Sequence, residues 1–122
     1  MTNKQFSDWL ERLKNAWETK NPGSIVDLCS EEVLWYETPF SKPLKTKGDI
    51  LKEWQSVLNQ ENISISYKIL CISENLGIAQ WLATFTKLPS KQRVVFDGIF
   101  QISLNERGEC VEFHQWFNSK EQ

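Results

Sequence analysis

Hydrophobic residues in the first part of the chain recur with the period of an α-helix. They fall on one helical face at Phe6, Trp9, Leu10, Leu13, Ala16 and Trp17. Thr2 and Gln5 precede this face at the spacing of a capping box, in which each side chain bonds the backbone N–H of the other residue. The pattern predicts a first helix that buries this face.

Two further helices are predicted from their start signals. Asn21 followed by Pro22 is typical of an N-cap and a first helical position, so a short helix should begin there and end near Ser30. Thr46 and Asp49 form a second capping signature. The apolar face that follows it comprises Ile50, Leu51, Trp54, Val57 and Leu58.

The rest of the pattern predicts strands. Residues 32–37 are β-branched and aromatic, and Pro39 must end their strand because proline cannot donate to the ladder. From Asn62 onward the hydrophobic period becomes two, and turn residues divide this part into four long strands of an antiparallel meander. We therefore predict one α+β domain over residues 1–122. Three helices from its N-terminal half would cover a curved antiparallel sheet and close a cone.

The composition adds little net charge but many aromatic rings. Fourteen basic and sixteen acidic residues leave a net charge of −2, which gives no broad positive field for nucleic acid. Six Trp and seven Phe indicate either a ring-rich core or a cavity lined with rings. We expect a small hydrophobic molecule, and no nucleic acid, as the partner.

The sequence offers no signal for a metal or a cofactor. One histidine and three scattered cysteines (Cys29, Cys71 and Cys110) form no ligand set, and there is no glycine-rich phosphate loop. The cysteines lie among apolar residues, where buried free thiols are usual, so we predict a reducing, cytoplasmic location. No segment reads as a signal peptide or a membrane span, and no membrane partner is expected.

Three polar side chains among large apolar residues are candidates for chemistry. Alternation places Asp97 on a face with Val95 and Ile99, which we expect inside the cone, where desolvation would favour a protonatable carboxyl. Asp97 is thus the predicted general acid or base, with Glu37 as its catalytic partner and Gln115 holding a ligand carbonyl or hydroxyl oxygen. The alternatives are an Asp97 that accepts backbone N–H groups and a Glu37 that is a solvated rim residue.

The last predicted strand has a second face with its own pattern. Glu112, His114 and Trp116 alternate with the inward set and should point away from the cone. A sheet face that carries such rings usually meets another surface, which predicts a homodimer packed sheet to sheet. The alternative is a scatter of ordinary surface aromatics.

The layout as a whole resembles the nuclear transport factor 2-like superfamily, in its SnoaL-like branch of small stand-alone domains. The features that carry the resemblance are Phe6–Trp17, Asn21-Pro22, the aromatic strand before Pro39, Asp97-Gly98-Ile99-Phe100 and Gly108–Asn118. The resemblance implies a cone-shaped fold with an apolar pocket. Enzymes of this superfamily, such as ketosteroid isomerase and limonene epoxide hydrolase, use that pocket for isomerisation, ring closure or epoxide opening without a cofactor.

Individual positions match the family pattern unevenly. Asp97 matches the strand aspartate that such enzymes use as an acid, whereas Val95 and Gln115 replace the arginine and aspartate of the epoxide hydrolase pattern. That hydrolase triad is therefore broken. The expected ligand-binding residues are Trp35, Trp54, Trp81, Phe85, Phe100, Phe113 and Gln115.

Three functions remain open at this point. The first is cofactor-independent acid/base chemistry of the isomerase, cyclase or hydrolase type, with Asp97 and Glu37 as catalytic residues. The second is a non-catalytic module that binds a small ligand in the same pocket. The third is a protein-interaction domain that uses the sheet face.

Overall fold

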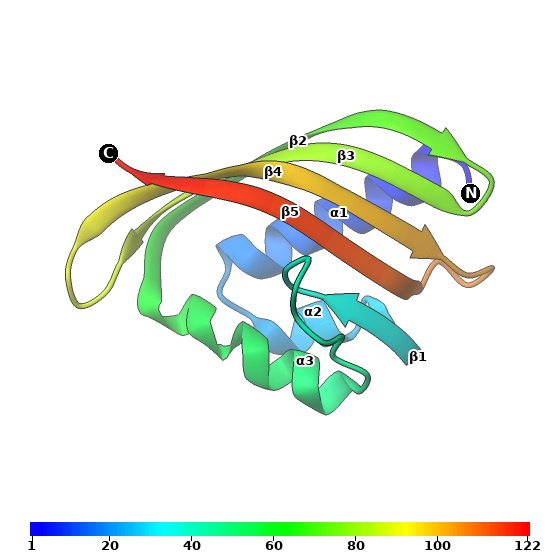
Figure 1. Ribbon diagram of the computed structural model, residues 1–122, viewed down its shortest axis with the longest axis horizontal. Helices are drawn as coiled ribbons and strands as arrows, with labels where there is room; N and C mark the ends of the chain where they lie inside the picture. Colours follow the sequence, from blue (N-terminus) through cyan, green and yellow to red (C-terminus); the bar gives the residue numbers. More distant parts are fainter.

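The computed structural model describes all 122 residues, and its chain order follows the predicted succession of helices and strands. The helical elements are α1 (Asn3–Glu18), α2 (Pro22–Val26), α3 (Lys47–Glu53) and the 3-10 helix η1 (Trp54–Asn59). The strands are β1 (Cys29–Tyr36), β2 (Gln60–Ser73), β3 (Leu76–Lys87), β4 (Gln92–Leu104) and β5 (Cys110–Glu121). In Figure 1 the helices lie together beneath the concave side of one strongly bent sheet.

The helices begin where local side-chain chemistry can satisfy their first N–H groups. Thr2 and Gln5 form both bonds of a capping box at α1, and Asn21 caps α2 with Pro22 in its first turn. Thr46 accepts a bond from the Asp49 N–H at the start of α3. These predicted starts are confirmed.

The sheet has the strand order β1-β5-β4-β3-β2. Strands β2 to β5 form an antiparallel meander, and β1 joins its edge in parallel with β5, so the sheet is mixed. It remains an α+β fold with three helices against a curved sheet, and the predicted fold class is confirmed.

The concave face of the sheet and the apolar face of α1 make the core. Trp35 stacks on Phe113 with ring centroids 3.7 Å apart, and Trp81 stacks on Phe100 at 4.8 Å. All four rings are buried. The many aromatic residues thus fill most of the cone with packed rings.

Alternation within β4 decides which of its side chains face this core: Val94, Phe100, Ile102 and Leu104 are buried, so the even-numbered positions point inward. A β-bulge at Val111 of the partner strand β5 leaves this alternation unchanged. Leu104 pairs with Cys110, but Ser103 pairs with Glu112, so the register shifts by one residue between them. Beyond the shift, Phe100 lies opposite Gln115 on the concave side.

Asp97 therefore lies on the convex side, opposite Asn118, and is exposed. The prediction that Asp97 faces the interior is wrong. Its hydrogen-bond partner is Gln80, whose amide Nε2 lies 3.4 Å from the carboxyl Oδ1 on the neighbouring strand.

Two smaller expectations also need correction. Leu51 and Leu58 were expected on the buried face of the third helix, but both are exposed. For Leu58 the reason is the change from α-helix to 3-10 helix at Trp54, which alters the spacing of the buried face. Cys29 and Cys110 are buried, whereas Cys71 is exposed because a register shift after Ile69 turns it outward.

Two general features bear on the functional classes. No helix is long and apolar enough to cross a membrane. No group of three or more His, Cys, Asp or Glu side chains is placed to hold a metal ion.

Candidate functional site

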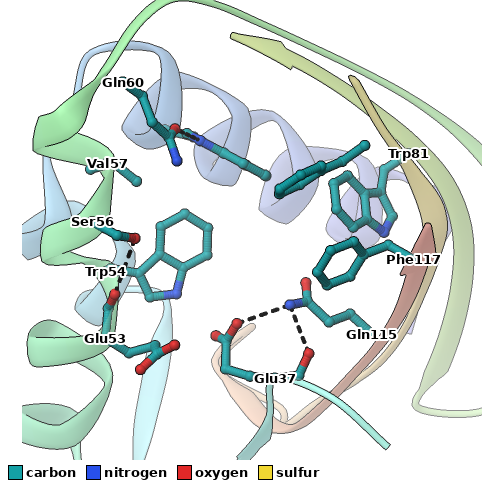
Figure 2. Close-up of a pocket in the computed structure, with 11 residues that line it drawn as sticks. Glu37, Glu53, Trp54, Ser56, Val57, Gln60, Trp81, Gln115 and Phe117 are labelled. Atoms are coloured by element: carbon teal, nitrogen blue, oxygen red, sulfur yellow. Dashed lines mark hydrogen bonds between the residues drawn. The ribbon is translucent and has the colours of Figure 1, made fainter. Parts of the chain in front are cut away.

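A cavity of about 100 Å³ lies between the 3-10 helix, the end of α1 and the concave face of the sheet. Figure 2 shows its lining side chains converging from both sides. The lining residues are Trp17, Glu37, Glu53, Trp54, Ser56, Val57, Gln60, Trp81, Phe96, Gln115 and Phe117.

Glu37 is the carboxyl at the end of this cavity. It follows directly on β1, and the pleat places it on the same side of the chain as Trp35. The Trp35 indole Nε1 donates to its Oε1 at 2.6 Å, and the Gln115 amide Nε2 donates to its Oε2 at 2.9 Å. Both oxygens are thus held, and the carboxyl has a fixed orientation toward the cavity (Figure 2).

Burial gives this carboxyl an unusually high pKa. Desolvation raises the pKa of Glu37 from 4.5 to about 7, and the nearby Glu53 carboxylate adds to the rise through like-charge repulsion. The bonds from Trp35 and Gln115 pull the pKa of Glu37 the other way, because they stabilise the anion. The balance lets Glu37 exist in both protonation states near neutral pH.

Gln115 lines the cavity, and its amide nitrogen is directed at Glu37. Its Nε2 donates to the Glu37 backbone carbonyl at 3.0 Å as well as to the Glu37 carboxyl. A backbone carbonyl can only accept, which fixes the amide orientation, and both amide hydrogens are then used. Gln115 therefore positions Glu37 and has no N–H left for a ligand oxygen.

The predicted aromatic set divides into two layers. Trp54 and Trp81 line the cavity from opposite sides (Figure 2). The other rings are buried in the core and are not among the lining side chains: Trp35, Phe85, Phe100 and Phe113. Sequence alternation found the inward face of each strand but could not say how deeply the cone is filled.

Several lining residues were missed by the sequence reasoning. Trp17 was assigned to the helical core face, and its indole Nε1 donates to the Gln60 Oε1 at 2.8 Å at the cavity edge. Phe117 lies on β5 on the same side as Gln115 and was not among the predicted ligand-binding residues. Glu53, Ser56 and Gln60 carried no signal, because their position depends on the switch from α-helix to 3-10 helix at Trp54.

The convex face of the sheet carries a row of stacked rings. Tyr36 and His114 have ring centroids 4.3 Å apart, and His114 and Trp116 are 5.7 Å apart, with nearly parallel planes in both pairs. The His114 Nε2 lies 2.9 Å from a Glu112 carboxyl oxygen. Trp116 is 41% exposed and Leu82, on the same side of the sheet, is 40% exposed.

The bent sheet with helices on its concave side is the architecture of nuclear transport factor 2-like proteins. A family model described as a SnoaL-like domain matches residues 10–113, which is most of the chain. The chain belongs to the SnoaL-like family. No curated protein sequence matches it.

Solved structures share the fold at low sequence identity. One is the epoxide hydrolase/cyclase-like enzyme SalBIII of pyran ring formation in salinomycin (TM-score 0.85, 11% identity, 100% of both chains). A second is Δ5-3-ketosteroid isomerase from a Mycobacterium species (TM-score 0.82, 8% identity, 97% of this chain and 98% of that one). A third is a computationally designed 17-OHP binder (TM-score 0.79, 11% identity, 93% and 95%). At these identities the likeness concerns the fold alone.

Proposed function

We propose that this SnoaL-like domain transfers a proton to and from carbon on a small organic substrate, without a cofactor, and that Glu37 is the catalytic acid/base. The observation that carries the proposal is the enclosed Glu37 carboxyl, held by Trp35 and Gln115, with its pKa raised to about 7 by burial. A base works best when its pKa lies near the operating pH. Asp97 has no part in this chemistry, because it is exposed on the convex face.

Each surrounding side chain has a role in the proposed reaction. Gln115 and Trp35 hold the carboxyl in one orientation, which reduces the entropy lost when the substrate and the base must meet. The rings of Trp54, Trp81 and Phe117 exclude water from the carboxyl and provide apolar contact for the substrate. The fold neighbours include an isomerase and a cyclase-like enzyme, which is compatible with this type of chemistry.

The test measures exchange of carbon-bound hydrogen for deuterium. Small ketones would be incubated with the protein in D2O, and loss of the α-proton signal followed by NMR. We expect wild type to accelerate exchange, with a rate that rises with pH to a plateau around the pKa of Glu37, because the carboxylate is the base. Glu37→Gln should reduce the rate at least a hundredfold.

The matched control is Asp97→Asn, which removes the other carboxyl that has a glutamine partner. It should leave the exchange rate unchanged. If Asp97→Asn reduces the rate as much as Glu37→Gln, the assignment of Glu37 is wrong.

A non-catalytic ligand-binding module is the second candidate. The ring-lined cavity favours it, and the designed 17-OHP binder has the same fold. The two candidates separate in the same experiment. Ketones that bind wild type without any exchange would support the binding module and exclude proton transfer on them.

The convex face is proposed as a homodimer contact, made by Glu112, His114 and Trp116. The exposed Trp116 and Leu82 side chains support this, since exposed apolar groups gathered on one sheet face often mark an interface. Light scattering should give twice the chain mass for wild type and a single chain mass for Trp116→Ala. Phe40→Ala, which truncates a fully exposed ring outside the sheet, is the control and should remain a dimer.

A further inference from the structure

The indole N–H groups in the core are not all satisfied. Trp9 donates to the Leu28 carbonyl at 3.0 Å, Trp17 to the Gln60 side chain and Trp35 to the Glu37 carboxyl. The Nε1 atoms of Trp54 and Trp81 are buried and have no acceptor. A buried donor without an acceptor has lost its water and gained nothing in return, so each such group calls for an explanation.

The Trp54 donor lies beside the acid/base. The Trp54 side chain is 8% exposed and packs edge-on against Trp17, with ring centroids 5.1 Å apart, and against Trp35 at 6.3 Å. These contacts fix the plane of its ring. Figure 2 shows the indole nitrogen at the edge of Trp54 that is turned toward the carboxyl groups of Glu37 and Glu53.

The other donors of the lining are bonded or distant. The Ser56 hydroxyl donates to the Glu53 carbonyl, and the Gln60 amide lies at the opposite end of the cavity from Glu37 (Figure 2). Both amide hydrogens of Gln115 are bonded to Glu37, and the Trp35 N–H is bonded to Glu37 as well. Trp81 lies across the cavity, on the far side from Glu37 (Figure 2). The Trp54 N–H is therefore the free donor on the wall next to the acid/base.

We propose that the Trp54 N–H binds a carbonyl oxygen of the ligand, and that the substrates are small neutral carbonyl compounds. The chemical part of this proposal rests on the proton transfer proposed for Glu37. In that step the Glu37 carboxylate takes a proton from the carbon next to the carbonyl. The C–H electron pair moves toward the carbonyl to form an enolate, and the Trp54 N–H stabilises the charge on its oxygen. Return of the proton from Glu37 to carbon restores the carboxylate and completes the cycle.

The cavity limits the size of the group that enters. A dry cavity of about 150 Å³ holds benzene, so about 100 Å³ accommodates roughly four non-hydrogen atoms. The carbonyl and its immediate neighbours would fill it, and a longer tail would have to lie in the mouth beside Glu53. Two nearby carboxyl groups disfavour an anionic ligand.

The binding test compares two probes of the same shape. Cyclobutanone carries the oxygen, and methylenecyclobutane replaces it with a CH2 group that cannot accept. In wild type labelled with ¹⁵N, cyclobutanone should move the Trp54 indole proton resonance downfield, whereas methylenecyclobutane should leave it near its free position. Trp54→Phe, which keeps an aromatic ring and removes the donor, should weaken cyclobutanone binding roughly fivefold to tenfold and methylenecyclobutane binding less than twofold.

Trp116→Phe is the matched control, because it makes the same change on the convex face. It should alter neither affinity. The proposal is overturned if the two probes bind wild type equally well, if Trp54→Phe weakens both to the same degree, or if neither probe binds. Cyclobutanone binding without a shift at Trp54 would also overturn it.

Two outcomes distinguish failure of the Trp54 oxygen site from failure of the proton transfer proposed for Glu37. A Trp54 shift with cyclobutanone in a protein that never exchanges α-protons would leave the oxygen site standing and remove the catalysis. Exchange that is lost in Glu37→Gln but unchanged in Trp54→Phe would leave the catalysis standing and remove the oxygen site.

Discussion

The two faces of the sheet carry the same pair of groups in different surroundings. On the concave face the Gln115 amide nitrogen lies 2.9 Å from the Glu37 carboxyl, and on the convex face the Gln80 amide nitrogen lies 3.4 Å from the Asp97 carboxyl. The first pair is enclosed by rings at the end of a cavity, and the second is exposed. The residue types alone would have favoured neither pair.

The difference shows that burial turns a carboxyl with a hydrogen-bonded amide into a group suited to neutral-pH chemistry. Desolvation is the largest cause of the raised pKa of Glu37, and the amide bond works against it. Gln115 thus fixes the orientation of the Glu37 carboxyl, while burial among the surrounding side chains raises its pKa.

The largest expected effect is on stability, from removal of a ring on the concave face. Trp81→Ala should reduce the free energy of unfolding by about 3–5 kcal/mol, because the buried indole leaves a large hole between Phe100 and Phe117. Leu82→Ala changes the next residue, on the convex face, and should cost less than about 1 kcal/mol. Urea denaturation of the two variants measures the contrast, and equal losses would contradict it.

The next effect concerns the close contact between β4 and β5 at Gly98, which pairs with Phe117. A Cβ atom on Gly98 would collide with the Trp116 carbonyl and the Phe117 side chain, so Gly98→Ala should cost about 3 kcal/mol. Gly48→Ala is the control, because its Cβ would meet only the Thr46 hydroxyl at 3.8 Å within α3. That change should stabilise the protein slightly in the same denaturation experiment, by roughly 0.5 kcal/mol.

A comparable effect appears when pH is varied. Because burial raises the pKa of Glu37 to about 7, the folded state binds a proton that the unfolded chain releases above its ordinary pKa of 4.5. Stability should therefore fall as pH rises from about 4.5 to about 7, by on the order of 3 kcal/mol. Glu37→Gln should flatten this part of the stability profile, and Asp97→Asn should preserve it. A wild-type profile that is flat over this range would contradict the enclosed state of Glu37.

The smallest expected effect is that of Asp97→Asn on stability at neutral pH. The Asp97 carboxyl is exposed and its bond to Gln80 is long, so the change should stay within about 0.5 kcal/mol. A loss of several kcal/mol would contradict the exposed position of Asp97.

The sequence predicted the helices well because their signals are local. Thr2 with Gln5, Asn21 with Pro22, and Thr46 each satisfy N–H groups only a few residues away, so no distant part of the chain has to be known. The alternation in β5 was also sufficient to place Phe113 and Gln115 inward and His114 outward.

The candidate site was harder to predict, because alternation offers two faces of β4 and does not say which one the helices cover. Asp97 shares one face with Val95 and Ile99, whereas Val94, Phe100, Ile102 and Leu104 lie on the other face, and the second face is the buried one. Glu37 follows the end of β1, and its contact with Gln115, 78 positions away, depends on the parallel pairing of β1 with β5. Alternation within single strands cannot reveal that pairing.

The outward turn of Cys71 gives the protein a single addressable thiol. Burial raises the pKa of Cys29 to about 12 and also raises that of Cys110, so neither forms the reactive thiolate readily, and both are shielded from reagents. A maleimide dye added to the unaltered chain should therefore attach at Cys71, on a strand of the sheet remote from Glu37 in the sequence. Fluorescence from that one position would follow the molecule without any mutation near the cavity.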